Sequence, residues 1–178
     1  MTSLLQGAGW RVGHFGKWHL GSGHDPSTNE SAPVPTAYGI DKSCTFNSND
    51  ACIADAQTFN TSVDIMDRAM QFIADSHAAD VPFYVNIWLH VSYDRLDPTE
   101  SQKAEALPLS CRSKGLATNQ TVCAQAVFLA AQADADAQVA RLNRLLSRLD
   151  LHESTLLLFS TDNGPEEQRV YINAQVCA

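Results

Sequence analysis

The chain is organised around the stretch Gly9-Trp10-Arg11-Val12-Gly13-His14-Phe15-Gly16-Lys17-Trp18-His19-Leu20-Gly21. Its four glycines let the backbone turn tightly and approach a ligand closely, and a lysine and two histidines lie among them. Lys17 and His19 are two residues apart, so on an extended segment both side chains can face the same bound group. An ammonium group offers a compact positive charge to oxyanions, and an imidazole can accept or donate a proton. We interpret this stretch as a candidate anion-binding site.

Two other interpretations of the stretch are open. In the first, it is the end of a buried strand with Trp10, Phe15 and Trp18 in the core, and Lys17 extends its amine to solvent. In the second, it begins with a dinucleotide-binding loop. Residues 7–12 argue against the second interpretation, because they lack the last glycine of the G-x-G-x-x-G pattern and follow a helix-like segment, not a strand.

The same stretch carries a resemblance to a known family. Gly9-Trp10, followed by Gly16-Lys17-Trp18-His19-Leu20-Gly21, closely resembles the second signature of the sulfatase family. This resemblance implies that Lys17 contacts the sulfate group of the substrate and that His19 lies beside the nucleophile. It also implies a fold of the alkaline-phosphatase and sulfatase type, with residues 1–178 as part of the N-terminal catalytic domain.

The composition is that of a soluble globular protein. The 178 residues are 44% hydrophobic and 18% charged. The net charge of -8 argues against nucleic acid or an anionic membrane surface as a partner, because both need a basic surface. No apolar run reaches the roughly 18 residues of a membrane span. Met1 is not followed by a secretory leader, and we expect the chain to be an internal fragment of a longer protein.

The cysteines favour disulfide bonds over a metal site. None of the five belongs to a C-x-x-C pattern, so a structural zinc site is a poor interpretation. Pairs formed by Cys44 with Cys52, and by Cys111 with Cys123, would each close a short polar loop and leave Cys177 over. The sequence does not establish this connectivity.

Glycosylation sequons, like cysteines in loops, favour a protein of the secretory pathway. Three sequons begin at Asn29, Asn60 and Asn119, at or near predicted loops. Together with cysteines in loops, they predict a glycoprotein of the secretory pathway, either extracellular or in a lysosome-like compartment.

The pattern of apolar residues predicts alternating helices and strands. A nearly continuous apolar strand, such as residues 82–89, is typical of a parallel sheet covered on both faces. We therefore expect an α/β fold with a mostly parallel sheet flanked by helices. The predicted elements are a helix end over 2–8, a strand over 10–16, an irregular region over 22–55, a helix over 61–77, a strand over 82–89, a loop-rich region over 94–123, a helix over 124–149 and a last buried strand over 155–161.

The two longer helices have predicted apolar sides. In the long helix, Asp134 and Asp136 point about 200° apart, so we expect a solvated face and no metal pair there. The apolar side of the helix over 61–77 is predicted to contain Val63, Met66, Ala69, Met70 and Ile73.

Polar residues follow two of the predicted strands. His90 follows residues 82–89, and Asp162 and Asn163 follow residues 155–161. Ligands of doubly wound sheets gather at the carboxyl ends of strands, so these side chains and Lys17 are expected at one edge. Carboxylate and amide oxygens suit a hard cation. A hydrogen-bonding role for His90 and a simple Asp-Asn-Gly turn are the structural alternatives.

The order of these segments extends the sulfatase resemblance from about Leu4 to Glu166. It implies that Asp162 and Asn163 bind the catalytic Ca²⁺ and that the strand over 82–89 leads into an H-x-x-H segment. The second histidine of that segment contacts the sulfate and can protonate the leaving oxygen. In this chain the segment reads His90-Val91-Ser92-Tyr93, so a phenol replaces the second imidazole. With a pKa of about 10, a phenol is the weaker acid at neutral pH.

The resemblance assigns catalytic roles to Lys17, His19 and His90, and Lys17 and His90 would also bind the substrate sulfate. The family's nucleophile is a formylglycine made from a C/S-x-P-x-R motif, which this chain lacks. The nearest imitation, residues 31–35, has no arginine. We therefore expect a calcium-dependent sulfate-ester hydrolase only in the complete protein, acting on a small sulfate ester or a sulfated glycan. The alternatives are an inactive relative that binds an anion or a partner, and a related phosphoesterase.

Overall fold

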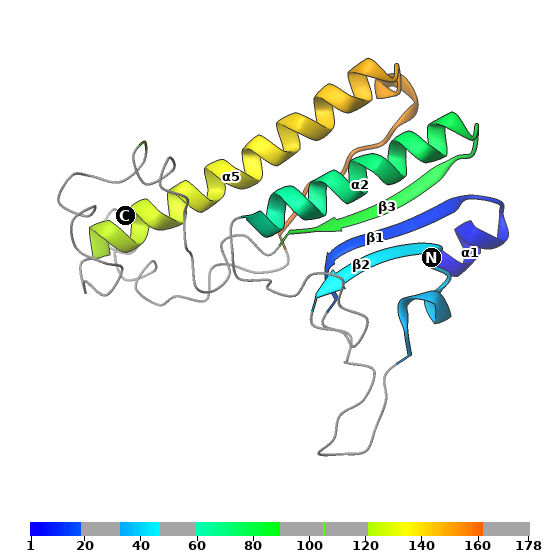
Figure 1. Cartoon of the computed structure of the whole chain (residues 1–178), viewed down its shortest axis with the longest axis horizontal. Coiled ribbons are helices and arrows are strands. Elements are labelled where there is room, and N and C mark those ends of the chain that lie inside the picture. Colours follow the sequence, from blue (N-terminus) through cyan, green and yellow to red (C-terminus); the bar gives the residue numbers. More distant parts are fainter. Residues whose placement is uncertain (19–32, 47–59, 90–104, 106–120, 162–178) are drawn as a thin grey trace, which may run out of the picture.

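The computed structural model describes residues 1–18, 33–46, 60–89, 105 and 121–161 (Figure 1). Strands and flanking helices form an α/β fold over these ranges, which confirms the predicted fold class. The elements are α1 (Thr2–Gly7), β1 (Arg11–Lys17), the 3₁₀ helix η1 (Pro35–Tyr38), β2 (Lys42–Phe46), α2 (Asn60–Ala78), β3 (Phe83–Trp88), α5 (Thr121–Arg148) and the 3₁₀ helix η2 (His152–Ser154).

The three strands form one parallel sheet in the order β2-β1-β3. Gly13 of β1 lies opposite Lys42 on one side and Val85 on the other. The central strand, Arg11–Lys17, lies within the glycine-rich stretch that the sequence singles out. The strands predicted over 10–16 and 82–89 are both confirmed, within one or two residues at each end.

Helix α2 covers one face of the sheet. Phe15 of β1 and Phe72 of α2 are fully buried, with their ring centroids 5.7 Å apart. The predicted packing of this helix on the sheet is thus confirmed, together with most of its apolar side. Val63 is the exception and is 37% exposed, because it lies about 200° around the helix from the buried Ile65.

Helix α5 lies beside α2 and contributes to the same core (Figure 1). Leu142, Leu145 and Leu146 of α5 pack with Met66 and Ile73 of α2, and the side chains of β3 on this face join them. The long helix predicted over 124–149 is therefore confirmed.

The prediction that Asp134 lies on a solvated face is wrong. Asp134 is 7% exposed, and its carboxylate accepts a hydrogen bond of 3.3 Å from Nε2 of Gln138. The reason is its spacing of four from Ala130 and from Gln138, which places all three on the buried stripe that leads to Leu142. Asp136 is exposed, as predicted.

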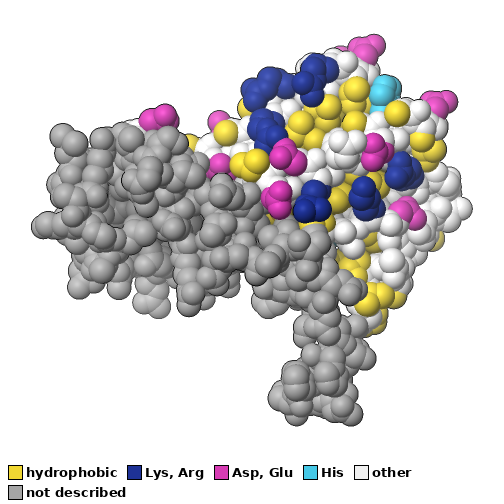
Figure 2. Space-filling view, in the orientation of Figure 1, with side chains coloured by type: hydrophobic (Ala, Val, Ile, Leu, Met, Phe, Trp, Pro, Cys, Tyr) yellow, Lys and Arg dark blue, Asp and Glu magenta, His cyan; other side chains and the backbone are white. Residues whose placement is uncertain are grey.

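The outer side of α2 and α5 carries charges of both signs, as Figure 2 shows. Arg68 lies 3.8 Å from Asp64 within α2, and Arg141 of α5 forms an ion pair with Asp67 of α2. Exposed pairs of this kind contribute up to about 1 kcal/mol each. The Arg141–Asp67 pair connects the two helices, and both pairs add little to the stability that the apolar core supplies.

The second face of the sheet is covered by α1 and η1. Val12, Trp18 and Ile40 are buried there, and Leu5 and Tyr38 pack against them. Asp41, which directly precedes β2, joins these parts because its Oδ2 accepts a hydrogen bond from the Val12 amide at 2.7 Å. Its Oδ1 accepts another from the Gln6 side chain at 2.6 Å.

Strand β2 is absent from the sequence-based prediction, which treats residues 22–55 as irregular. The segment Lys42–Phe46 contains only two strongly strand-forming residues, Thr45 and Phe46, and is surrounded by Gly, Pro, Ser and Asn. This segment becomes a strand because β1 provides a hydrogen-bonding partner along its whole length. Tertiary pairing thus decides its structure.

The prediction of a last buried strand over 155–161 is also wrong. The segment is extended at Thr155, with φ -119° and ψ 123°, but it joins no sheet. Leu156, Leu158 and Phe159 are each at least 80% exposed. Figure 1 shows the segment running in the same direction as β3. Within the described ranges no strand pairs with the outer edge of β3, so the apolar pattern of 155–161 has no partner to bury it.

The unpaired outer side of β3 also explains why this strand is less buried than predicted. Its residues are half-buried, and Trp88 is 44% exposed. None of the helices that the structure describes has the length and apolarity needed to cross a membrane.

Candidate anion-binding site

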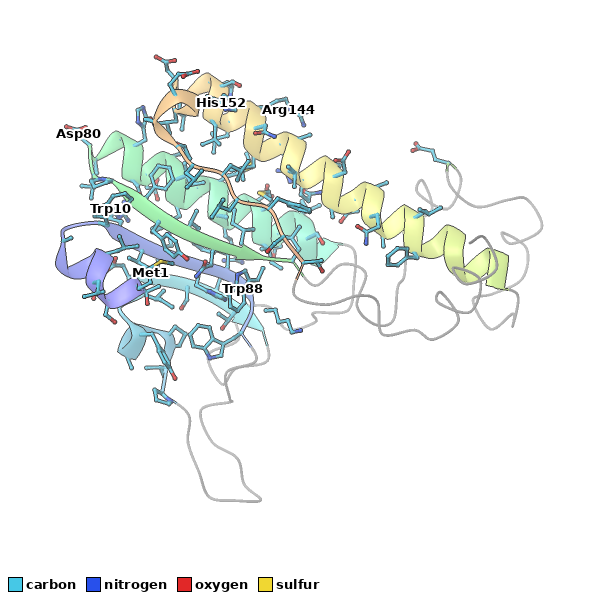
Figure 3. All side chains as sticks on the ribbon, turned by 180° about the vertical axis from the view of Figure 1, so that it is seen from behind. Met1, Trp10, Asp80, Trp88, Arg144 and His152 are labelled. Atoms are coloured by element: carbon cyan, nitrogen blue, oxygen red, sulfur yellow. The ribbon has the colours of Figure 1, made fainter. Side chains whose placement is uncertain are left out.

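The three parallel strands end at the same edge of the sheet. Lys17, the last residue of β1, lies opposite Phe46, the last residue of β2. Gly16 lies opposite Trp88, the last residue of β3. Figure 3 shows Trp88 at this edge. Lys17 therefore occupies the centre of the edge where ligands of parallel α/β sheets bind.

Gly16 lets β1 and β3 approach each other closely at this edge. Its φ of +110° belongs to the region that favours glycine, and an added Cβ would lie 1.9 Å from the carbonyl oxygen of Trp88. No other residue type fits there without a shift of the backbone. The glycine therefore fixes the end of β3 directly beside Lys17.

An aromatic cluster lies on one face of the sheet at the end of β1. It consists of His14, Trp18, Tyr38 and Trp88. The His14 ring makes edge contacts with both tryptophans, at centroid distances of 5.1 Å to Trp18 and 4.7 Å to Trp88. Trp18 in turn contacts Tyr38 at 5.5 Å. The cluster spans β1, β3 and η1 and supports the edge from one face of the sheet.

His14 is hydrogen-bonded to the backbone of the candidate site. Its Nε2 lies 3.0 Å from the carbonyl oxygen of Lys17, and its side chain is 1% exposed. Burial lowers the pKa of His14 below its ordinary value of 6.5, and the hydrogen bond to Lys17 opposes this to a lesser extent. The imidazole is therefore neutral at pH 7. Sequence reasoning did not single out His14, although its even spacing from Val12 and Trp18 places it on their buried face.

The interpretation of this stretch as a buried strand end is correct for part of it. Phe15 and Trp18 are in the core, while Trp10 is 39% exposed. Lys17 is half-buried. A half-buried lysine at the end of a buried strand is compatible with both interpretations, and the anion site stays a prediction.

The other predicted site residues lie outside the described residues. His19 follows Trp18, His90 follows Leu89, and Asp162 and Asn163 follow Thr161. The described ranges therefore end one residue before each of His19, His90 and Asp162. Tyr93 likewise lies outside.

No metal-binding group is formed by the described side chains alone. Among them no three His, Cys, Asp or Glu residues lie close enough together to hold a metal ion. The predicted calcium ligands, Asp162 and Asn163, are outside this part of the chain.

Cys44 is located in β2 and is 4% exposed. It lies opposite Phe15 in the sheet, and its sulfur is disulfide-bonded. The side chains of the other four cysteines are outside the described part of the chain.

The fold and the edge of the sheet define an α/β protein with a candidate anion site where its parallel strands end. No family model and no curated protein matches the chain. Among solved structures, it is similar to the crystal structure of Ps i-CgsB in complex with k-i-k-neocarrahexaose, with a TM-score of 0.62 and 14% sequence identity. The match covers 86% of this chain and 37% of that one, so this chain spans little more than a third of the length of that protein. At this identity the similarity shows the fold alone.

Proposed function

We propose that this chain is part of a sulfatase-like hydrolase domain and that its candidate anion-binding site binds a sulfate ester. The position of Lys17 is the observation that carries the proposal. It ends the central strand of a parallel sheet, with the ends of β2 and β3 on either side. The sulfatase-like motif around it supports the choice of sulfate among the oxyanions.

A sulfated glycan is the substrate class we favour. The similar structure contains a bound neocarrahexaose, which is a sulfated glycan. The shared fold supports a related ligand for this chain, and the glycan would bind at the edge of the sheet where the parallel strands end. Small aryl sulfates are the practical probe for the same chemistry.

In the complete protein, the residues of this chain would act on the sulfate group in separate roles. The Lys17 ammonium would offset negative charge on the sulfate oxygens, which is the kind of electrostatic stabilisation that often dominates catalysis. His19 would orient the nucleophile, and His90 would donate a hydrogen bond to the sulfate. Tyr93 would be a weak substitute for a second imidazole at neutral pH.

Asp162 and Asn163 fit a calcium ion by their chemistry but not by their number. Carboxylate and amide oxygens are the donors that Ca²⁺ prefers, whereas the ion takes six or more oxygen ligands. Further ligands would have to come from polypeptide beyond these two residues. When bound, the ion would supply additional positive charge to the sulfate oxygens.

The nucleophile is not provided by this chain. Hydrolysis through a covalent intermediate needs an activated nucleophile, and no C/S-x-P-x-R motif occurs in the sequence. We therefore propose that the 178 residues bind the anion without turnover. An inactive, anion-binding relative is the second candidate function, which the missing motif and Tyr93 favour.

The disulfide at Cys44 supports the secretory pathway as the compartment we propose. Structural disulfides persist in oxidising compartments and are rare in the cytosol. Cys52 is the partner we favour, because it is the cysteine nearest to Cys44 in the sequence.

Titration with inorganic sulfate tests the proposed site directly. We expect the chain to bind sulfate and Lys17→Ala to weaken binding by about 10-fold to 100-fold, the loss that follows from one charge-assisted hydrogen bond. Lys42→Ala is the matched control, because Lys42 begins β2 at the opposite edge of the sheet and is exposed. Equal sulfate affinity for the two variants would contradict the role of Lys17. A preference for phosphate over sulfate would favour the phosphoesterase alternative.

A further inference from the structure

His14 is a buried imidazole without a role in the proposed chemistry. It occupies the middle of the central strand, opposite Asn86 of β3 and Ser43 of β2, and only 1% of its surface is exposed. Burying a polar side chain is unfavourable unless it is hydrogen-bonded. The hydrogen bond that His14 makes is directed at the candidate site.

The partner of His14 defines which ring nitrogen carries the proton. The carbonyl oxygen of Lys17 can only accept a hydrogen bond, so Nε2 of His14, 3.0 Å away, must be the donor. Since burial keeps the ring neutral, Nδ1 is unprotonated. The structure thus specifies a single tautomer.

This hydrogen bond acts where the chain leaves the sheet. It fixes the peptide group between Lys17 and Trp18, immediately after the last strand residue and before His19. The His14 ring is itself held between Trp18 of the same segment and Trp88 at the end of β3. One side chain therefore connects the ends of the two strands that lead to Lys17, His19 and His90.

We infer that His14 is a positioning residue, whose Nε2–H holds the Lys17 carbonyl and thereby aims the Lys17 ammonium at the bound anion. This inference rests on the proposed function, because it assumes that Lys17 binds the anion. His14 contacts neither the anion nor the reacting atoms. It acts through the backbone of Lys17.

Two substitutions separate the hydrogen bond from the volume of the ring. His14→Phe keeps an aromatic ring between the tryptophans but has no donor. His14→Gln can place an amide N–H near the position of Nε2. We expect His14→Phe to weaken inorganic sulfate binding by about tenfold, the effect of one hydrogen bond, and His14→Gln to stay within about threefold of wild type.

The decisive experiment repeats the sulfate titration in a Lys17→Ala background. If His14 acts through Lys17, His14→Phe causes no further loss there. An equal loss in both backgrounds would show a general structural role and overturn the inference, as would equal affinities for wild type and His14→Phe. A ¹⁵N spectrum in which Nδ1, not Nε2, carries the proton would also overturn it. If Lys17→Ala alone leaves sulfate affinity unchanged, the proposed function fails instead.

Discussion

The carbonyl oxygen of Trp88 occupies the space that a side chain on Gly16 would need. An ideal Cβ at Gly16 would lie 1.9 Å from this oxygen, at a φ of +110°. The two residues lie opposite each other in the register of β1 and β3. Their contact sets how closely the two strand ends approach beside Lys17.

Replacement of Gly16 by alanine should strongly destabilise the protein. The backbone strain alone costs about 1–3 kcal/mol, and the clash with backbone atoms of Trp88 adds to it. Urea denaturation measures the change. The control is Gly7→Ala in α1, where an added Cβ meets nothing within 4 Å. Alanine there should be neutral or stabilise by up to about 1 kcal/mol. Equal stability of the two variants would contradict the close contact.

The neutral state of His14 predicts a pH dependence of stability. Its pKa is lowered in the folded protein, so the unfolded chain binds a proton first as the pH falls below about 6.5. The stability that the neutral ring provides is therefore complete above this pH and is lost as the pH falls toward the lowered pKa.

Urea denaturation at pH 7.5 and pH 5.5 measures this effect. The loss of unfolding free energy between the two should be smaller in His14→Phe than in wild type, because the variant has no group to protonate there. His77→Gln, at an exposed position of α2, controls for the removal of an imidazole. The same loss in wild type and in His14→Phe would show that His14 is protonated in the folded state as well.

The two phenylalanines Phe72 and Phe159 should differ sharply in their effect on stability. Phe72 is fully buried, so Phe72→Ala should cost about 3–5 kcal/mol. Phe159 is 80% exposed, and Phe159→Ala should change stability by at most about 0.5 kcal/mol. Denaturation midpoints of the two variants provide the comparison. A large loss for Phe159→Ala would mean that residues 155–161 are a buried strand after all.

The segment over 155–161 also shows what a sequence can and cannot reveal. Its run of Leu156, Leu157, Leu158 and Phe159 is the apolar pattern of a strand buried on both faces. In the structure, however, these side chains are exposed. Whether such a segment is buried depends on a partner strand, which local sequence does not identify. β2 is the opposite case, because pairing with β1 makes a strand of residues 42–46 despite their polar surroundings.

The candidate site divides in the same way. The glycines and Lys17 predict an anion site at a strand end, and the structure places Lys17 at the edge where the parallel strands end. The sequence does not reveal the side-chain contacts around Lys17. The hydrogen bond of His14 and its contact with Trp88 depend on the register between β1 and β3, which only the fold establishes.

Cys44 is disulfide-bonded, and we predict that its partner is Cys52. Mass mapping of protein from the secretory pathway under non-reducing conditions should find a peptide that links Cys44 to Cys52. The same digest after reduction serves as the control. Five free thiols would remove the main support for the proposed compartment, and a link from Cys44 to Cys111, Cys123 or Cys177 would correct the pairing.

The most direct test of the proposed function is hydrolysis of a chromogenic aryl sulfate by the complete protein with calcium present. We predict turnover by wild type and by Lys42→Ala, a loss of at least about 100-fold in Lys17→Ala, and no turnover by the isolated 178 residues. An inactive complete protein would favour the anion-binding relative, and faster release of an aryl phosphate would favour the phosphoesterase. Full activity of Lys17→Ala would contradict the central claim that Lys17 at the end of β1 binds the sulfate.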